Sequence, residues 1–196
     1  FWGVMPVYFK IVDAVPSMEV FAHRVLWSVP FGLIVILIRK QWHEIKRAAI
    51  NPNVLKFLFF SALLISINWY LYIVAVQTNE ILQASLGYYI NPLLYVLVGV
   101  TFLNERLRTL QLVAIFIAAI GVLILTLSTG KFPWIAVSLA ITFTAYGVIR
   151  KNVDVGAMPG LFIETIFILP FAVGYFYFLA NNGTLFFGND HLLDSF

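Results

Sequence analysis

The chain has 196 residues, of which 62% are hydrophobic and only 11% are charged, and its formal net charge is +3. A soluble domain is about 25% charged, so this chain has too few charged side chains to cover a surface that faces water. The composition therefore excludes an ordinary soluble protein. It predicts an all-α polytopic membrane protein, a helical bundle whose outer surface faces lipid.

Several classes of enzyme and cofactor site are also excluded by the sequence. Without cysteine, the chain can form no disulfide, no thiolate metal site and no cysteine nucleophile. His23, His43 and His191 lie far apart, and the sequence contains no HExxH, P-loop or GxSxG motif. We therefore expect no enzyme, no catalytic residues, no metal and no cofactor, and ATP hydrolysis by this chain cannot drive a transport cycle.

The spans can be read in chain order from hydropathy. Residues 1–12 are too short to cross a bilayer, which takes about 20 residues, and they read as the second half of a helix. Six longer apolar segments follow, at residues 18–38, 54–76, 81–103, 109–128, 132–149 and 160–180. Residues 41–53 read as a hydrophilic connector. The sequence thus predicts six full spans after a partial first one.

The basic residues predict the orientation of these spans. Of the 12 Lys and Arg residues, nine fall on one side of the predicted bundle: Arg39, Lys40, Lys46, Arg47, Lys56, Arg106, Arg108, Arg150 and Lys151. Loops rich in Lys and Arg stay in the cytoplasm. We therefore expect this side, and the N-terminus, to be cytoplasmic. Basic residues scattered in short loops favour this interpretation over a nucleic-acid partner.

Pro92 lies in the middle of the predicted span 81–103, within the segment of residues 83–108. Proline removes one backbone hydrogen bond and bends a helix, which lipid tolerates only where neighbouring groups replace the lost bond. The sequence therefore predicts a helix interrupted at Asn91 and Pro92, beside a cavity. Interrupted helices mark transporter sites. Tyr88, Asn91 and Pro92 are therefore candidates for a substrate path.

Small residues predict two faces where helices approach closely. One face lies in residues 109–128 and the other in residues 132–149. Their members are Ala114, Ala118 and Gly121 on the first, and Ala136, Ala140 and Gly147 on the second.

Arg24 lies inside a predicted span, where a charge needs a reason. One interpretation is that Arg24 meets an anionic group of the substrate, with His23 as a proton-sensitive neighbour and Trp27 one turn away. The other is that Arg24 extends toward the membrane surface and pairs with Asp13 or Glu19. The sequence alone leaves both interpretations open.

Two further groups of polar residues have a functional and a structural interpretation. Asn68 and Tyr72, four residues apart, either line an aromatic pocket for a substrate or form hydrogen bonds between helices, worth about 0.6 kcal/mol each. Arg150 and Glu164 lie at the same level of neighbouring spans. They form either a gate or a static ion pair. Glu105 is expected to form solvated ion pairs with Arg106 and Arg108 in a loop at the membrane interface.

Several stretches together resemble the RarD-type permeases of the EamA branch of the drug/metabolite transporter superfamily. They cover nearly the whole chain: HRVLWS at 23–28, NWYLYIVAV at 68–76, ASLGYYINPLLYVLVG at 84–99, FLNERL at 102–107, PWIAVSLAITFTAYGVIRK at 133–151 and GLFIETIFILP at 160–170.

The resemblance implies a bundle of two inverted five-helix repeats. On that pattern, residues 1–129 are the first repeat without the start of its first helix, and residues 131–196 begin the second, giving about seven of ten helices. The implied function is a secondary-active permease of the bacterial inner membrane that exports or imports small organic metabolites or drugs by alternating access. The implied partners are a small-molecule substrate and the lipid bilayer, and a homodimer is left open. The alternative is a non-transporting receptor or accessory protein built on the same bundle.

Overall fold

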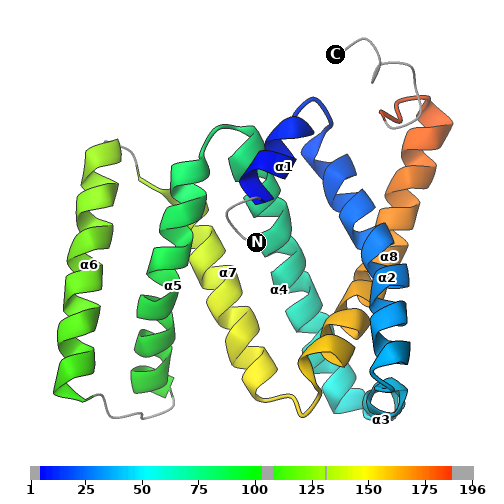
Figure 1. Cartoon of the computed structure of the whole chain (residues 1–196), viewed down its shortest axis with the longest axis horizontal. Helices are drawn as coiled ribbons and strands as arrows, with labels where there is room; N and C mark the ends of the chain where they lie inside the picture. The colour runs from blue at the N-terminus through cyan, green and yellow to red at the C-terminus, as the bar shows by residue number, and fades with distance from the viewer. Residues whose placement is uncertain (1–4, 103–107, 131, 187–196) are drawn as a thin grey trace.

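The computed structural model describes residues 5–102, 108–130 and 132–186, and every regular element in that part of the chain is an α-helix (Figure 1). The elements are α1 (Met5–Ile11), α2 (Ser17–Ile38), α3 (Trp42–Ile50), α4 (Pro52–Gln77), α5 (Ile81–Phe102), α6 (Thr109–Thr129), α7 (Trp134–Lys151) and α8 (Ala157–Asn182).

Five of the described helices, α2, α4, α5, α6 and α8, are long and apolar enough to cross a membrane. The prediction of an all-α polytopic membrane protein is thereby confirmed. The remaining predicted span, 132–149, forms α7, which is not one of these five. Its 18 residues include several hydroxyl groups and end in Arg150 and Lys151. Since α7 packs between α4 and α5, neighbouring helices shield its polar side chains.

Most of the predicted connector at residues 41–53 forms the short helix α3, which was not predicted from the sequence. Ala48 of α3 is buried and, with Ile45, belongs to a small apolar cluster around Leu58 of α4. The side chain of Asn51 then caps α4 by accepting the N–H groups of the second and third residues after it, at 3.1 and 3.3 Å.

The predicted interruption at Asn91 and Pro92 is wrong. α5 continues as a helix from Ile81 to Phe102. α2 and α8 likewise continue through Pro30 and Pro170. The N–H that a proline lacks therefore does not end a helix in this bundle. Pro92 does not mark the break of an interrupted transporter helix.

α4 lies at the centre of the bundle (Figure 1). It packs against α7, α8 and α2, and it also contacts α1, α3 and α5. The other two large helix–helix interfaces join α5 to α7 and α2 to α8. α6 stands at the edge, where its main contact is α5. Polar residues on α4 can therefore reach most of the other helices.

The two predicted faces of small residues have different outcomes. On α7, Ala136 and Ala140 are completely buried, and Gly147 leaves room for the ring of Tyr95 from α5. On α6 the predicted face is wrong within this chain, since its three members are exposed: Ala114, Ala118 and Gly121.

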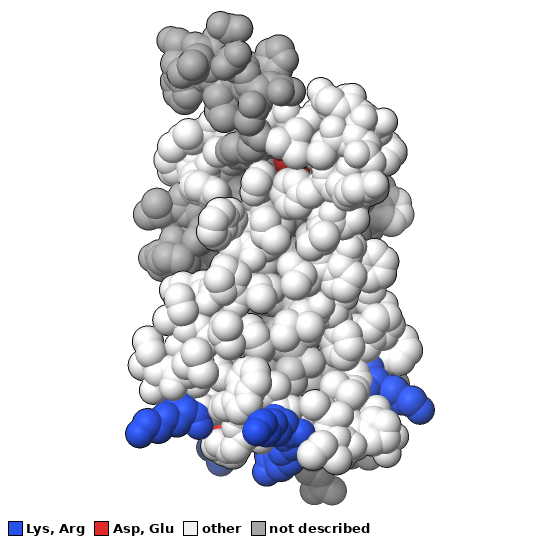
Figure 2. Space-filling view, turned by 90° about the vertical axis from the view of Figure 1, so that its right-hand side faces the viewer, with Lys and Arg blue, Asp and Glu red and all other residues white. Residues whose placement is uncertain are grey.

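Positively charged side chains gather at one end of the bundle, as Figure 2 shows for one face. α2, α5 and α7 finish at this end, and α4, α6 and α8 start there (Figure 1). It also holds the short helix α3. The loops assigned to one side from the sequence therefore meet in space.

Gln77, the last residue of α4, ties the turn between α1 and α2 to the centre of the bundle. Its side-chain nitrogen donates to the carbonyl oxygens of Val12, at 3.1 Å, and Val15, at 3.0 Å. Its carbonyl oxygen accepts a hydrogen bond from the hydroxyl of Ser17. One amide thus bonds to three groups in this turn.

Replacing Gln77 with Ala is expected to lower the free energy of unfolding by about 1–3 kcal/mol, because two backbone carbonyls and one hydroxyl lose their partner. Chemical unfolding of the purified protein in detergent micelles measures this. Asn53→Ala removes an exposed amide from the first turn of the same helix and serves as the control. Equal effects of the two substitutions would contradict the role assigned to Gln77.

Candidate functional site

One face of α4 carries the buried residues Ser61, Ile65, Asn68, Tyr72 and Val76. Their spacing of three or four residues places them in one stripe along the helix. The three polar members contact different helices at different levels. The candidate site is therefore built around this stripe.

An aromatic–arginine cluster, consisting of Arg24, Trp69, Tyr72 and Tyr88, lies where α2, α4 and α5 come together. The guanidinium carbon of Arg24 is 4.2 Å from the centre of the Trp69 ring, within the range of a cation–π interaction. The ring of Tyr72 meets that of Tyr88 edge to face, with centroids 6.1 Å apart. Both tyrosines lie within electrostatic range of Arg24.

The ion pair expected from the structural interpretation of Arg24 is wrong. Asp13 pairs instead with Lys10 at 2.8 Å. The carboxylate of Glu19 is buried and accepts the backbone N–H of Phe186, with distances of 3.1 and 3.3 Å to its two oxygens. Within the described part of the chain, Arg24 forms no ion pair. It lies on an aromatic ring because α4 presents Trp69 at its level.

Asn68 joins α4 to α7. Its side-chain nitrogen donates to the carbonyl oxygen of Leu139 and the hydroxyl of Thr142, both at 2.9 Å. One level further along, the side-chain oxygen of Asn91 accepts a hydrogen bond from Thr144 at 3.1 Å. The amides of both asparagines therefore hold α7 between α4 and α5, as interhelical hydrogen bonds would.

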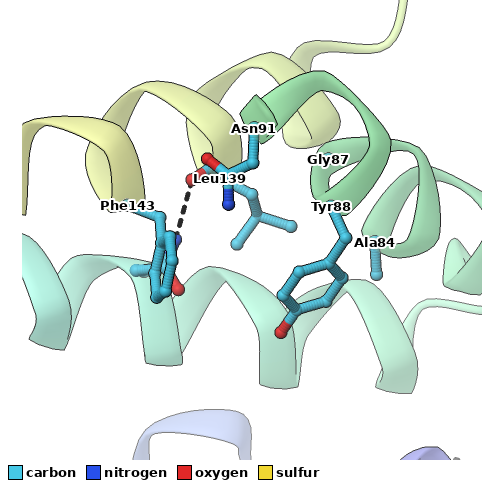
Figure 3. A pocket seen from close by; sticks show the side chains of 7 residues that line it. Ala84, Gly87, Tyr88, Asn91, Leu139 and Phe143 are labelled. Carbon is cyan, nitrogen blue, oxygen red and sulfur yellow. Dashed lines mark hydrogen bonds between the residues drawn. The ribbon is translucent and has the colours of Figure 1, made fainter. Parts of the chain in front are cut away.

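The same amides border a small pocket, shown in Figure 3 with the bond from Asn68 to Leu139 dashed. Its lining consists of Asn68, Ala84, Gly87, Tyr88, Asn91, Leu139 and Phe143. Tyr88 projects across the pocket from α5 (Figure 3) and is 47% exposed. Tyr88 thus belongs both to this pocket and to the aromatic–arginine cluster.

Three of the predicted path residues lie elsewhere. The ring of His23 meets Phe176 of α8 edge to face, with centroids 4.6 Å apart. Trp27 is 68% exposed, and Pro92 is exposed on the outer side of α5. The structure therefore brings together Arg24, Tyr72 and Tyr88, and places Asn68 and Asn91 beside the last of these. It does not add His23, Trp27 or Pro92 to that group.

A second cluster, the carboxylate cluster, consists of Ser61, Tyr146, Arg150 and Glu164. Glu164 is only 1% exposed. One of its oxygens accepts the Ser61 hydroxyl at 2.6 Å and lies 3.5 Å from Nε of Arg150. The other accepts the Tyr146 hydroxyl at 3.3 Å. The two residues that the sequence placed at one level are therefore in contact.

Arg150 also organises the turn between α7 and α8. Its Nη2 donates to the carbonyl oxygens of Val155, at 3.3 Å, and Gly156, at 3.2 Å. The cluster therefore fixes α8 to both α4 and α7. The ion pairs expected at Glu105 cannot be compared, because residues 103–107 lie outside the described residues.

A second small pocket lies between the two clusters, in the space between α2, α4 and α8. It has about 200 Å³ of empty volume, part of it open, and is lined by Val25, Ile65, Ser66, Trp69, Glu164, Thr165 and Ile168. Trp69 belongs to one cluster and Glu164 to the other. Binding sites for small molecules usually measure about 300–1,000 Å³, so this arrangement would have to widen to hold a whole ligand.

Sequence reasoning gave no site role to several residues that complete these clusters. Ser61 lies seven residues before Asn68, so a search for polar residues on one helical face finds it. Tyr146 stands four residues before Arg150 on α7, which is the same kind of signal. The contact between Trp69 and Arg24 has no such signal, because it depends on how two helices are placed.

Gly160→Ala is expected to disturb the carboxylate cluster, because the added methyl group would meet the guanidinium of Arg150. Displacing that group removes its bonds to the turn and to Glu164, for a loss of about 1–3 kcal/mol. Gly174→Ala, in the same helix but facing open space, makes the same chemical change without a clash. Chemical unfolding in micelles compares the two. Equal stability would show that Arg150 moves at no cost.

Comparison with known proteins places the chain in a family. The profile of the EamA-like transporter family matches residues 1–127. Protein RarD of Salmonella typhi is 40% identical over 191 residues, which is 97% of this chain and 65% of that protein. Uncharacterized transporter YojE of Bacillus subtilis is 44% identical over 181 residues, or 90% of this chain and 60% of that one.

A third relative, the Chloramphenicol-sensitive protein RarD of Pseudomonas aeruginosa, is 32% identical over 186 residues, or 93% of this chain and 62% of that protein. No solved structure matches the chain. The chain spans just under two thirds of the length of these relatives. The resemblance found in the sequence is confirmed, and the chain belongs to the EamA-like transporter family, within which it is similar to the RarD proteins.

Proposed function

We propose that this chain is the larger part of a secondary-active permease that moves small organic metabolites or drugs across the bacterial inner membrane by alternating access. Membership of a transporter family supports this proposal. The observation that carries it is the convergence of polar side chains from four helices on α4. They lie inside a bundle whose helices are otherwise apolar.

Polar and charged groups inside a membrane protein are costly and usually mark a path for a substrate or ion. Here they form two clusters at different heights, with a pocket that touches both. A path between the two ends of the bundle would run past these clusters. The chain contains no P-loop, so the proposed energy source is a gradient of protons or of the substrate.

The two-repeat organisation is part of the proposal, and a correspondence within the chain supports it. A shift of 140 residues aligns the starts of α2 and α8 and places identical residues at four positions: Val15 with Val155, Met18 with Met158, Pro30 with Pro170, and Phe31 with Phe171. α2 and α8 run in opposite directions and pack against each other (Figure 1). Inverted repeats place equivalent helices in this way.

The family profile ends at residue 127, close to the proposed boundary between residues 1–129 and 131–196. The proposed orientation puts the basic end of the bundle, and with it the N-terminus, in the cytoplasm. The gathering of Lys and Arg at one end supports this (Figure 2).

The pair of Arg150 and Glu164 is proposed to hold the bundle closed near its basic end. Its contacts favour a static pair over a moving gate, because both carboxylate oxygens already have partners from other helices. Removing one member of a buried pair commonly costs about 3–5 kcal/mol, since the other charge is left uncompensated.

The second candidate function is a receptor or accessory protein that keeps the bundle without transport. The two small pockets beside the clusters favour this alternative as they stand, since neither has the volume of a ligand site. A larger, open pocket of about 890 Å³ empty volume lies between α5 and α7, and its lining is almost wholly apolar. A small-molecule substrate remains the proposed partner. A homodimer stays a prediction.

Transport is tested by uptake into proteoliposomes that contain the full-length protein, with and without an imposed pH gradient. The candidate substrates are aromatic amino acids and chloramphenicol. We expect saturable uptake of at least one of them, with its extent changed by the gradient. Liposomes without protein are the control. Uptake at the control rate for every candidate would favour the receptor or accessory function.

A further inference from the structure

Arg24 is a charge that the described chain does not balance. Its side chain is half-buried on the second turn of α2 and lies against the Trp69 ring. The acidic groups nearest to it in sequence are both engaged, Asp13 by a lysine and Glu19 by a backbone N–H. The cation therefore has aromatic neighbours but no anionic one in the described residues.

Within the described residues, the side chain of Arg24 donates no hydrogen bond, so its hydrogen-bonding capacity is unused there. A guanidinium has five N–H donors arranged in a plane around its edge. The guanidinium carbon lies over the Trp69 ring, and a carboxylate binds a guanidinium along its edge through two parallel hydrogen bonds. An anion could therefore bind without displacing the indole.

The corresponding position of α8 shows what a balanced charge looks like in this bundle. Under the shift of 140 residues, Arg24 corresponds to Glu164, so the two helices carry opposite charges at equivalent places. Glu164 has a cation, Arg150, within 3.5 Å and two hydroxyl donors. Lys10 corresponds to Arg150, so the first half of the chain has cations at both positions.

The surroundings of Arg24 define the rest of a ligand. Phe9, Tyr72 and Tyr88 form a continuous row of aromatic rings, with edge-to-face contacts at centroid distances of 6.0 and 6.1 Å. Phe9 and Tyr72 are buried and Tyr88 is partly exposed, so the row is open at the end formed by Tyr88. It suits a flat apolar body joined to the charged group.

We propose that Arg24 binds the carboxylate of an amphipathic organic anion, whose apolar body lies against Tyr88 at the open end of this row of rings. This inference rests on the proposed permease function, and it names the class of substrate that the site would take. The anion supplies the counter-charge that Glu164 has in Arg150 and that Arg24 lacks among the described residues. The indole of Trp69 holds the guanidinium so that its edge faces the ligand.

Calorimetric titration of the full-length protein in micelles tests this with 3-phenylpropanoate and its uncharged amide, 3-phenylpropanamide. We expect the anion to bind at least about tenfold more tightly than the amide, because only the anion forms charge-assisted hydrogen bonds with Arg24. Arg24→Gln should remove that difference. Arg39→Gln, the same change at the exposed end of the same helix, should leave it unchanged.

Equal binding of the anion and the amide by the unmodified protein would overturn the proposal. So would a preference for the anion that survives in Arg24→Gln. If Arg24→Gln does not fold, Arg24→Lys decides. Lysine keeps the charge but lacks the planar fork, so we expect a weakened preference for the anion, and an undiminished preference would overturn the assigned geometry.

Uptake into proteoliposomes separates this inference from the proposed function. Saturable uptake of uncharged or cationic substrates only, without binding of the anion, would overturn the substrate class and leave the permease standing. Binding of the anion through Arg24 without uptake of any substrate would support the site and contradict the permease.

Discussion

The bundle depends on one constraint, which is that the polar groups of α4 that lie inside the bundle must bond to other parts of the protein. An unsatisfied polar group in a membrane costs several kcal/mol. Ser61 meets this requirement through Glu164 of α8, Asn68 through α7, and Gln77 through the turn that precedes α2. Because these residues lie at different heights, they fix the rotation of α4 about its axis. They also set the position of three neighbours relative to it.

The helices could largely be predicted from the sequence, because lipid demands long apolar segments and the chain has few polar residues to interrupt them. The short helix α3 could not. Four of its nine residues are charged or histidine, and its five apolar residues, among them Ala48, show their role only when α3 packs beside α4. The error at Pro92 has another cause. A proline removes one hydrogen bond, and the rest of α5 is long enough to hold the helix together.

Only those features of the site that depend on spacing within a single helix could be predicted from the sequence. The four-residue spacing of Asn68 and Tyr72 correctly predicts that they share a face. One of the two interpretations of Arg24 paired it with an acidic residue because acids are close in sequence, yet the guanidinium lies against Trp69 of α4. Distances between helices decided this outcome, and hydropathy carries no information about them.

The two clusters differ in a way that bears on mechanism. The carboxylate cluster is closed, because every oxygen of Glu164 is bonded and the side chain is fully buried. The aromatic–arginine cluster is partly open, and its cation has no anionic partner among the described residues. The favourable free energy of pairing Arg24 with an anion is available only when a ligand supplies that anion. The ligand gains this free energy in the conformation that keeps the cluster open. An anion that binds there would favour that arrangement over one in which the cluster closes, which is the differential affinity that any ligand-driven conformational change requires. The buried pair of Arg150 and Glu164 in the carboxylate cluster would stabilise the other arrangement.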